Sequence, residues 1–394
     1  MPDCRLSMRS FCLSMRNSRL VLLTALCLLA PLAFFSARTA AKAKDKDKDA
    51  GAASSKGLLL VAERPRAVQG QGEGEGIIGI VDPETGMELA RIPEGGTIAH
   101  MVAVVPGTNL AFVPIYGTGG VGNQGVDGTK ISVIDLGERK VIDMIDYGHP
   151  ARPHQVQFNP KDGLLYVTTE IDYALSIVDP KTKTIVGSIP TGQPESHDFV
   201  FSPDYKRAYT VNVFCGTISV LDLVNRKLLA IVPVVTDAAG NYGPGSAFRK
   251  MMVQRISISP DGRTVFTQDQ RHQALAMLDT KTLKVSGSIP LPERGLGSAV
   301  TPDGHYVLAA GADQVSVVDI KAMQVMKNIP IPKTPQEIFI RPDGQVAYVT
   351  SNAAPQVSAI NLSDWSVTPL TISERNAEGM AWWPNGKANN PAGN

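Results

Sequence analysis

Hydrophobic and polar positions alternate in short segments along the chain between residues 57 and 386, and turns separate the segments. Alternation with a period of two is typical of half-buried β-strands, and Gly and Pro interrupt every apolar run after the N-terminus. In the representative stretch 187–212, an apolar strand leads through Pro203-Asp204 into a second strand with Tyr209 and Val211. The pattern predicts an all-β chain of short strands and tight turns.

An apolar residue followed by Asp marks the end of the third strand in each repeat. The marker occurs at Asp82, Asp135, Asp179, Asp222, Asp279 and Asp319, and in a degenerate form at Asn361. Seven repeats with a period near 42 residues and four short strands each are typical of a β-propeller. We interpret these aspartates as structural, because a short carboxylate can accept hydrogen bonds from the backbone N–H groups of the next turn.

A Pro-Asp-Gly type turn separates the first two strands of most repeats. The turn prolines are Pro160, Pro203, Pro260, Pro302, Pro342 and Pro384, with a looser version at Pro106-Gly107. The last turn follows a first strand that has no second strand, whereas 57–62 resembles a second strand without a first. We therefore expect these two segments to pair, which would remove the exposed sheet edges and close the ring. The predicted fold is a seven-bladed β-propeller of four-stranded antiparallel blades.

The second strands contain the motifs Leu165-Tyr-Val-Thr168, Tyr209-Thr-Val-Asn212 and Ala347-Tyr-Val-Thr350. With the turns and strand ends above, the chain resembles the YVTN-repeat family of secreted seven-bladed propellers over roughly 57–386. The resemblance implies the fold, but that family includes surface-layer proteins and lactonase-like enzymes, so it leaves the function open. A more distant resemblance is to the haem domain of haem-type nitrite reductases, in which histidines near the channel mouth can serve a tetrapyrrole.

The N-terminal segment differs from the repeats. Four arginines between Arg5 and Arg19 precede an apolar run at 20–35, and small residues follow up to Ala41. This order is typical of a secretory signal, although an uncleaved membrane anchor stays open. We predict a signal peptide at 1–41, a flexible polar linker at 42–56, the propeller at 57–386 and a disordered tail at 387–394. The expected location is outside the cytoplasm, in the periplasm or cell envelope. Cys215 is the only cysteine after the signal, so no internal disulfide is expected.

The net charge of +1 provides no field that would recruit nucleic acid, and we expect a monomer without a nucleic-acid partner. Three long insertions would lie on one face of the propeller, at 63–76, 116–129 and 235–250. Long loops gathered on one face suggest a surface for an envelope protein partner, with tolerated insertion as the alternative.

Candidate functional residues occupy the position six residues before each turn proline. In blade order the positions are Glu378, His100, His154, His197, Gln254, Leu296 and Gln336. Half of the six histidines of the chain fall on these seven equivalent positions, and they occupy three consecutive repeats. A repeat can also duplicate a purely structural histidine, which would only brace neighbouring blades.

Imidazole groups, with or without a carboxylate, can bind Zn, Cu, Fe or Mn, ligate a haem-like tetrapyrrole, or act as general bases. We predict a metal site at His100, His154, His197 and Glu378, and a cofactor site at the same histidines with Arg255. The other flanking polar residues are Arg152, Glu195, Asp198 and Glu337. The sequence contains no Cys-x-x-Cys-His, so no covalent c-type haem is expected.

The leading prediction is a secreted binding protein that holds a metal or metal-containing cofactor, and with it a small-molecule ligand, at the channel mouth. A lactonase-like hydrolase or an oxidoreductase that uses the same residues is the first alternative. A cell-envelope interaction scaffold is the second. The residues alone leave open whether the protein is an enzyme.

Overall fold

The computed structural model describes residues 57–64, 74–118, 121, 125–235, 252–332, 334–374 and 376–386. The predicted signal peptide, linker and tail lie outside the described residues, as does most of the loops 63–76 and 235–250 and part of 116–129, so their assignments stay predictions. Within the described residues, no helix is long and apolar enough to cross a membrane.

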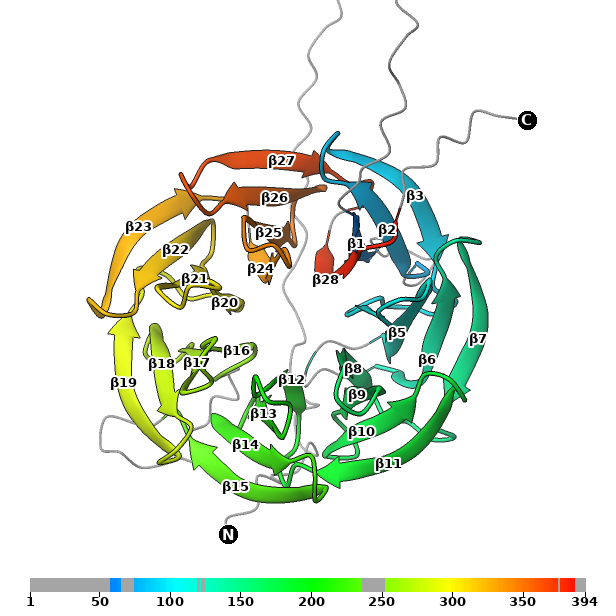
Figure 1. Ribbon diagram of the computed structural model, residues 1–394, viewed down its shortest axis with the longest axis horizontal. Coiled ribbons are helices and arrows are strands. Elements are labelled where there is room, and N and C mark those ends of the chain that lie inside the picture. The colour runs from blue at the N-terminus through cyan, green and yellow to red at the C-terminus, as the bar shows by residue number, and fades with distance from the viewer. Residues whose placement is uncertain are drawn as a thin grey trace, which may run out of the picture. The chain divides into compact units, whose positions relative to one another are not determined.

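The strands form seven four-stranded antiparallel sheets arranged in a ring, which confirms the predicted propeller (Figure 1). Blade 1 contains β28 (Ala377–Trp383), β1 (Leu58–Glu63), β2 (Ile77–Asp82) and β3 (Met87–Pro93). Blade 2 contains β4 (Ala103–Val104), β5 (Leu110–Gly117), β6 (Asp127–Asp135) and β7 (Lys140–Asp146). Blade 3 contains β8 (Pro153–Asn159), β9 (Leu164–Thr169), β10 (Ala174–Asp179) and β11 (Thr184–Pro190).

The remaining four blades follow the same order from the innermost to the outermost strand. Blade 4 contains β12 (Ser196–Phe201), β13 (Arg207–Asn212), β14 (Thr217–Asp222) and β15 (Lys227–Pro233). Blade 5 contains β16 (Ile256–Ile258), β17 (Thr264–Asp269), β18 (Ala274–Asp279) and β19 (Lys284–Pro290). Blade 6 contains β20 (Ser298–Val300), β21 (Tyr306–Ala310), β22 (Gln314–Asp319) and β23 (Gln324–Pro330), and blade 7 contains β24 (Pro335–Ile340), β25 (Val346–Ser351), β26 (Gln356–Asn361) and β27 (Val367–Thr371).

The residue that ends each third strand caps the turn after it, as predicted. Asp179 Oδ1 accepts a hydrogen bond from Lys181 N at 2.8 Å. The degenerate Asn361 does the same for Ser363 N, also at 2.8 Å. The same kind of cap occurs in the other five blades, at Asp82, Asp135, Asp222, Asp279 and Asp319. The residue that ends the third strand, Asp in six blades and Asn in blade 7, therefore has a structural role in every blade.

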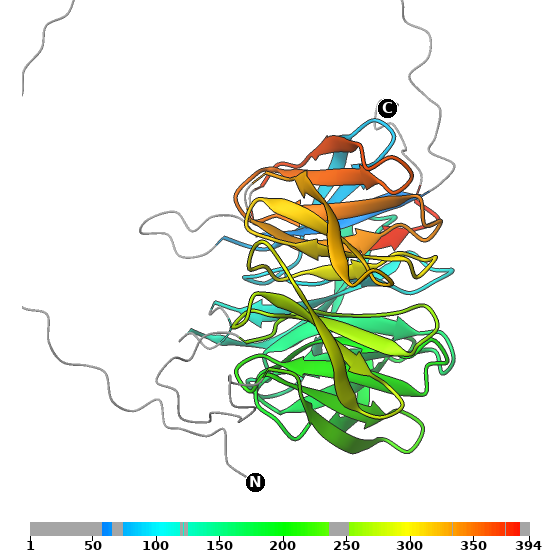
Figure 2. The ribbon, with the colours of Figure 1, turned by 90° about the vertical axis from the view of Figure 1, so that its left-hand side faces the viewer.

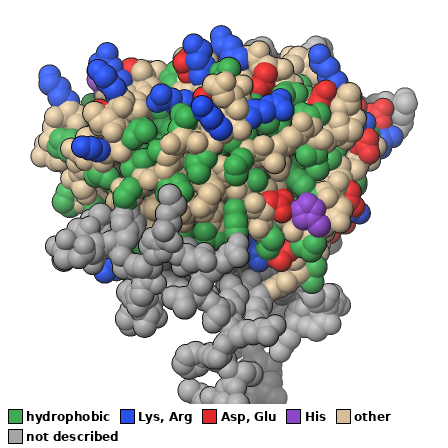
Figure 3. All heavy atoms as spheres, turned by 90° about the horizontal axis from the view of Figure 1, so that it is seen from below, with side chains coloured by type: hydrophobic (Ala, Val, Ile, Leu, Met, Phe, Trp, Pro, Cys, Tyr) green, Lys and Arg blue, Asp and Glu red, His purple; other side chains and the backbone are tan. Residues whose placement is uncertain are grey.

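The hydrophobic core lies between the faces of adjacent blades, which stand side by side around the ring (Figure 2). Leu60 and Ile80 of blade 1, for example, pack in one buried cluster with Ala111 and Val113 of blade 2. The apolar clusters span adjacent blades, so each blade depends on its neighbours for hydrophobic burial. On the outer wall, apolar side chains are exposed among polar ones (Figure 3), as expected for outermost strands that face solvent on one side.

The ring closes where the C-terminal strand joins the N-terminal blade. Strand β28 pairs with β1 in antiparallel register, with Leu58 opposite Trp383. This pairing confirms the predicted closure and makes β28 the innermost strand of blade 1. The loop between β27 and β28 adds contacts across the same junction, because Glu374 N donates to Glu63 Oε2 at 2.9 Å. We call the β28–β1 pairing, together with this loop from blade 7 into blade 1, the closing seam.

An irregular register in an innermost strand allows consecutive side chains of the candidate site to be buried. In β12 the pairing shifts between Ser196 and Phe199. Such an irregularity disrupts strict alternation, so consecutive side chains can reach the same side of a sheet. His197 and Asp198 are accordingly both buried, at 1% and 2% exposed.

Candidate metal centre

The three predicted histidines lie together near the centre of the ring, at or just before the innermost strands of blades 2, 3 and 4. The ring centroids of His100 and His154 are 4.7 Å apart, and those of His154 and His197 are 3.6 Å apart. All three residues are buried. We call them, together with Glu170, Asp198, Arg255, Glu337 and Glu378, the mouth cluster.

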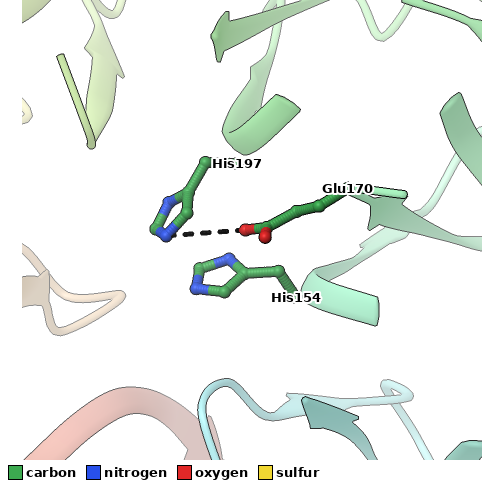
Figure 4. Close-up of side chains that lie close together, drawn as sticks. All are labelled: His154, Glu170 and His197. Atoms are coloured by element: carbon green, nitrogen blue, oxygen red, sulfur yellow. Dashed lines mark ion pairs between the residues drawn. The ribbon is translucent and has the colours of Figure 1, made fainter. Parts of the chain in front are cut away.

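Glu170, which the sequence reasoning missed, completes a possible metal-binding group. It directly follows β9 and is 1% exposed. His154, Glu170 and His197 each offer one ligand atom, and these atoms lie within 4.8 Å of one another (Figure 4). His197 Nε2 faces Glu170 Oε1 at 3.8 Å. Two imidazoles and a carboxylate are ligands that suit Zn, Fe and other first-row metals.

The surroundings of His197 fix which ring nitrogen carries the proton. Its Nδ1 lies 3.1 Å from the carbonyl oxygen of Gln254, which can only accept a hydrogen bond. Nδ1 is therefore the protonated nitrogen, and the lone pair of Nε2 is directed toward Glu170. Metal-binding histidines usually donate their second ring N–H to a carbonyl or carboxylate in this way.

Two residues of the blade 2–blade 3 junction hold the Glu170 carboxylate. The Tyr116 hydroxyl donates to Glu170 Oε2 at 2.8 Å, and Arg152 Nη1 lies 3.6 Å from the same oxygen. Arg152 is itself anchored by Asp127 Oδ1 at 2.6 Å. Burial and the nearby Glu195 raise the pKa of Glu170 well above its usual range, against the effect of Tyr116 and Arg152. The other carboxylate oxygen, Oε1, has no hydrogen-bond partner within the described part of the chain.

His154 is the most isolated of the three imidazoles. Neither of its ring nitrogens has a hydrogen-bond partner among the described residues, and the residue is 0% exposed. Its Nδ1 approaches Asp198 Oδ1 to 3.3 Å but without the geometry of a hydrogen bond. Burial, followed by the neighbouring His197, lowers the pKa of His154 to about 3. The ring is therefore neutral near pH 7, which is the form that binds a metal.

The other half of the mouth cluster is an ion-pair network around Arg255. Its guanidinium contacts Asp198 at 3.1 Å, Glu378 at 3.0 Å, and also Glu337. Burial raises the pKa of Glu337 to about 7, although Arg255 opposes this effect. Burial would also raise the pKa of Asp198, but Arg255 and the two adjacent imidazoles hold it below its usual range.

The structure thus divides the residues selected from the sequence between the two halves. His154 and His197 lie with Glu170, whereas Glu378 and Arg255 lie in the ion-pair network. His100 Nδ1 is 3.6 Å from Glu378 Oε2, but Arg64 and Arg255 already contact that carboxylate. Of the four predicted metal ligands, two therefore belong to the three-residue group, and His100 and Glu378 are its neighbours.

A sequence signal for Glu170 existed. Loops between the second and third strands of a blade lie on the same face as loops between blades, and Glu170 is the first residue of such a loop. Tyr116 and Arg64 also occupy the ends of second strands. Histidines outside the cluster have other contacts, as exposed His149 pairs with Asp172 at 2.9 Å.

No family model matches the chain, and no curated protein sequence matches it. The YVTN-repeat resemblance is therefore not confirmed by a family model. Solved structures similar to the chain include hydrazine synthase of Kuenenia stuttgartiensis, at 20% identity over 57% of this chain and 68% of that chain, with a TM-score of 0.47. Another is the dihydro-heme d1 dehydrogenase NirN in complex with DHE, at 13% identity over 85% of this chain and 77% of that chain, with a TM-score of 0.57. The likeness to NirN shows a shared propeller fold.

Proposed function

We propose that this propeller is a metal-binding protein whose mouth cluster holds one divalent transition-metal ion through His154, Glu170 and His197. The observation that carries the proposal is the set of buried ligand atoms without hydrogen-bond partners among the described residues: both nitrogens of His154, Nε2 of His197 and Oε1 of Glu170. Leaving a buried polar atom unpaired costs about 1–3 kcal/mol. Each residue offers one ligand atom to an ion, so a bound ion would engage three of these four atoms, one each from His154, Glu170 and His197.

The charge of the site supports a cation. If all groups were ionised, six carboxylates would face three guanidinium groups and leave a charge of −3, and burial accordingly raises the pKa of Glu170 and Glu337 in the metal-free site. A divalent ion would reduce this excess to −1, and the burial of the site makes such compensation important. The groups counted are Asp127, Glu170, Glu195, Asp198, Glu337 and Glu378, and Arg64, Arg152 and Arg255.

The number of protein ligands also bears on the function. Structural zinc sites are usually closed by four protein ligands, whereas three ligands leave coordination positions for a small molecule. This favours binding or conversion of a small molecule at the mouth over a plain interaction scaffold. A hydrolase or an oxidoreductase that uses the same metal is therefore the next candidate. Secretion to the periplasm or envelope is part of the proposal, and it rests on the basic and apolar N-terminal segment.

A tetrapyrrole is a second candidate for the same mouth. It is favoured by the likeness to NirN, which was solved in complex with DHE. The rings of His154 and His197, only 3.6 Å apart, leave no room for a macrocycle between them. A single ion fits the group more directly.

The test is the metal and chromophore content of the mature protein, purified without a His-tag or chelator. We expect close to one metal ion per chain and its loss in Glu170→Gln and His197→Ala, with the fold retained in circular dichroism. His149→Ala, which removes an exposed histidine, is the matched control and should keep the metal. A folded wild type that takes up none of Zn, Cu, Fe and Mn would contradict the proposal, and a bound pigment would favour the tetrapyrrole.

A further inference from the structure

Two glutamates of blade 1 face each other beside the closing seam. Glu63 ends β1 and is 0% exposed, while Glu88 lies in β3 and is half-buried. Both Oε1 atoms are buried without a hydrogen-bond partner in the described part of the protein. They meet above Gly79, where an added Cβ would lie 2.1 Å from Glu63 Oε1 and 2.6 Å from Glu88 Oε1. Two ionised carboxylates only accept hydrogen bonds, so this arrangement needs a proton on one of them.

The remaining oxygens of the pair reach across the seam. Glu63 Oε2 accepts a hydrogen bond from Glu374 N at 2.9 Å, and Glu88 Oε2 accepts one from the Ser373 hydroxyl. Arg91 Nη2 lies 2.6 Å from Glu374 Oε1. Ser373 and Glu374 belong to the loop between β27 and β28, which leads the chain from blade 7 into the closing strand. The two glutamates are thus hydrogen-bonded to the loop that leads into β28, the strand that closes the ring.

Blade 1 differs from the other blades at this point. The position three residues before the end of the third strand is Gly79 here. Its equivalents carry a small side chain, in the order Ser132, Ser176, Ser219, Ala276, Ser316 and Ser358. With a side chain at this position the two glutamates could not meet, because its Cβ would overlap their oxygens. Gly79 and the acid pair therefore form one feature of the blade that closes the ring.

We propose that Glu63 and Glu88 share one proton, and that the resulting carboxyl–carboxylate hydrogen bond fastens the closing seam and is released at alkaline pH. The Glu63 carboxyl group donates through Oε1 to Glu88 Oε1. Loss of the proton leaves two adjacent negative charges in a buried position, and their repulsion acts on the loop and on β28. The metal centre proposed above is not involved.

The electrostatic surroundings agree with this assignment. Burial, followed by Glu88, raises the pKa of Glu63 from an ordinary 4.5 to about 9. The charged groups that face it are Glu88 and Arg91 from β3 and Glu374 from the seam loop, and Arg91 and the Glu374 N–H act in the opposite direction. Because the folded state binds the proton more tightly than the unfolded chain, the stabilisation is complete below pH 4.5 and is lost as the pH rises toward 9.

Amide hydrogen exchange of the full mature protein at pH 6 and pH 9, corrected for the intrinsic rates, tests the inference. We expect the protection of residues 371–374 and 376–383 in the wild type to fall about tenfold or more at pH 9, which corresponds to about one pKa unit of coupling. The strands β18 and β19 of blade 5 are the internal reference and should keep their protection.

Two variants make the result specific to the acid pair. In Glu63→Gln the amide can donate to Glu88 at any pH, so seam protection should be the same at pH 6 and pH 9. Glu88→Gln, which removes the second charge, should also reduce the pH effect, and it serves if Glu63→Gln folds poorly. Glu84→Gln, at an exposed position, should behave like the wild type. Equal seam protection of the wild type at both pH values, or an unchanged pH effect in both variants, would overturn the proposal.

Discussion

Removal of one buried hydroxyl group should weaken metal binding without disturbing the propeller. Tyr116 is 1% exposed, and its hydroxyl donates to Glu170 Oε2 at 2.8 Å. In Tyr116→Phe the aromatic ring can remain in edge contact with His100, whose centroid is 4.5 Å away, and with His154. The substitution therefore removes the hydrogen bond and leaves the packing in place.

The size of the effect follows from the contacts of Glu170. A hydrogen bond to a charged group contributes about 1.5–3 kcal/mol. At 1.4 kcal/mol per factor of ten, this is roughly a 10- to 100-fold change in Kd. Arg152 stays within 3.6 Å of the same oxygen and compensates in part, so we expect a loss near the lower end, about tenfold.

The measurement is a titration of metal-free protein with Zn²⁺ in the presence of a competing chelator. Tyr166→Phe is a matched control, because its hydroxyl also donates to a carboxylate, Asp162 Oδ2 at 2.7 Å, but in a turn outside the mouth cluster. We expect the Kd of the control to equal that of the wild type. If Tyr116→Phe binds Zn²⁺ within a factor of two of the wild type, or if both variants lose affinity equally, Tyr116 does not position a ligand and the reasoning fails.

Two further predictions concern the propeller itself. Asp179→Ala removes the acceptor for Lys181 N and should lower the free energy of unfolding by about 1 kcal/mol, measured by urea denaturation, whereas a loss above roughly 3 kcal/mol would show that the acid does more than cap a turn. Gly295→Ala would place a Cβ 1.5 Å from the carbonyl oxygen of Ala310, so this variant should be strongly destabilised. Gly107→Ala is the control: the added Cβ has open space around it, so only the smaller cost of a positive φ is expected. A wild-type melting temperature for Gly295→Ala would contradict the close backbone approach between the loop that follows blade 5 and β21 of blade 6.

The fold could be predicted because its determinants are local and repeated. The Asp caps, the turn prolines and the period-two alternation each depend on residues within one blade. The closure at Leu58 and Trp383 followed from counting strands, since each unmatched strand needed a partner. None of these steps required knowledge of a distant side-chain contact.

The candidate site could be predicted only in part. Equivalent register positions found His100, His154 and His197, because a repeated strand places equivalent residues around one axis. Glu170 was not predicted, because it follows a second strand and approaches His154 and His197 from a different strand of the blade. The pair of Glu63 and Glu88 also escaped, because their encounter depends on the small volume of Gly79 between them. Both features depend on contacts between residues of different strands, and the residue spacing within one strand does not predict such contacts.

The differences between blades, more than the repeat, set the chemistry of the mouth cluster. Blades 3 and 4 supply the imidazoles of the candidate metal group, whereas the carboxylate partners of Arg255 come from blades 4, 7 and 1. Asp198 connects the two halves, with Oδ2 at 3.1 Å from Arg255 and Oδ1 at 3.1 Å from His197 Nδ1. Because one carboxylate contacts both groups, a change in the charge of the metal half should be transmitted to Arg255. Asp198 thus links the metal group of blades 3 and 4 to Arg255, and Arg255 links it to blades 7 and 1, a connection that identical repeats could not provide.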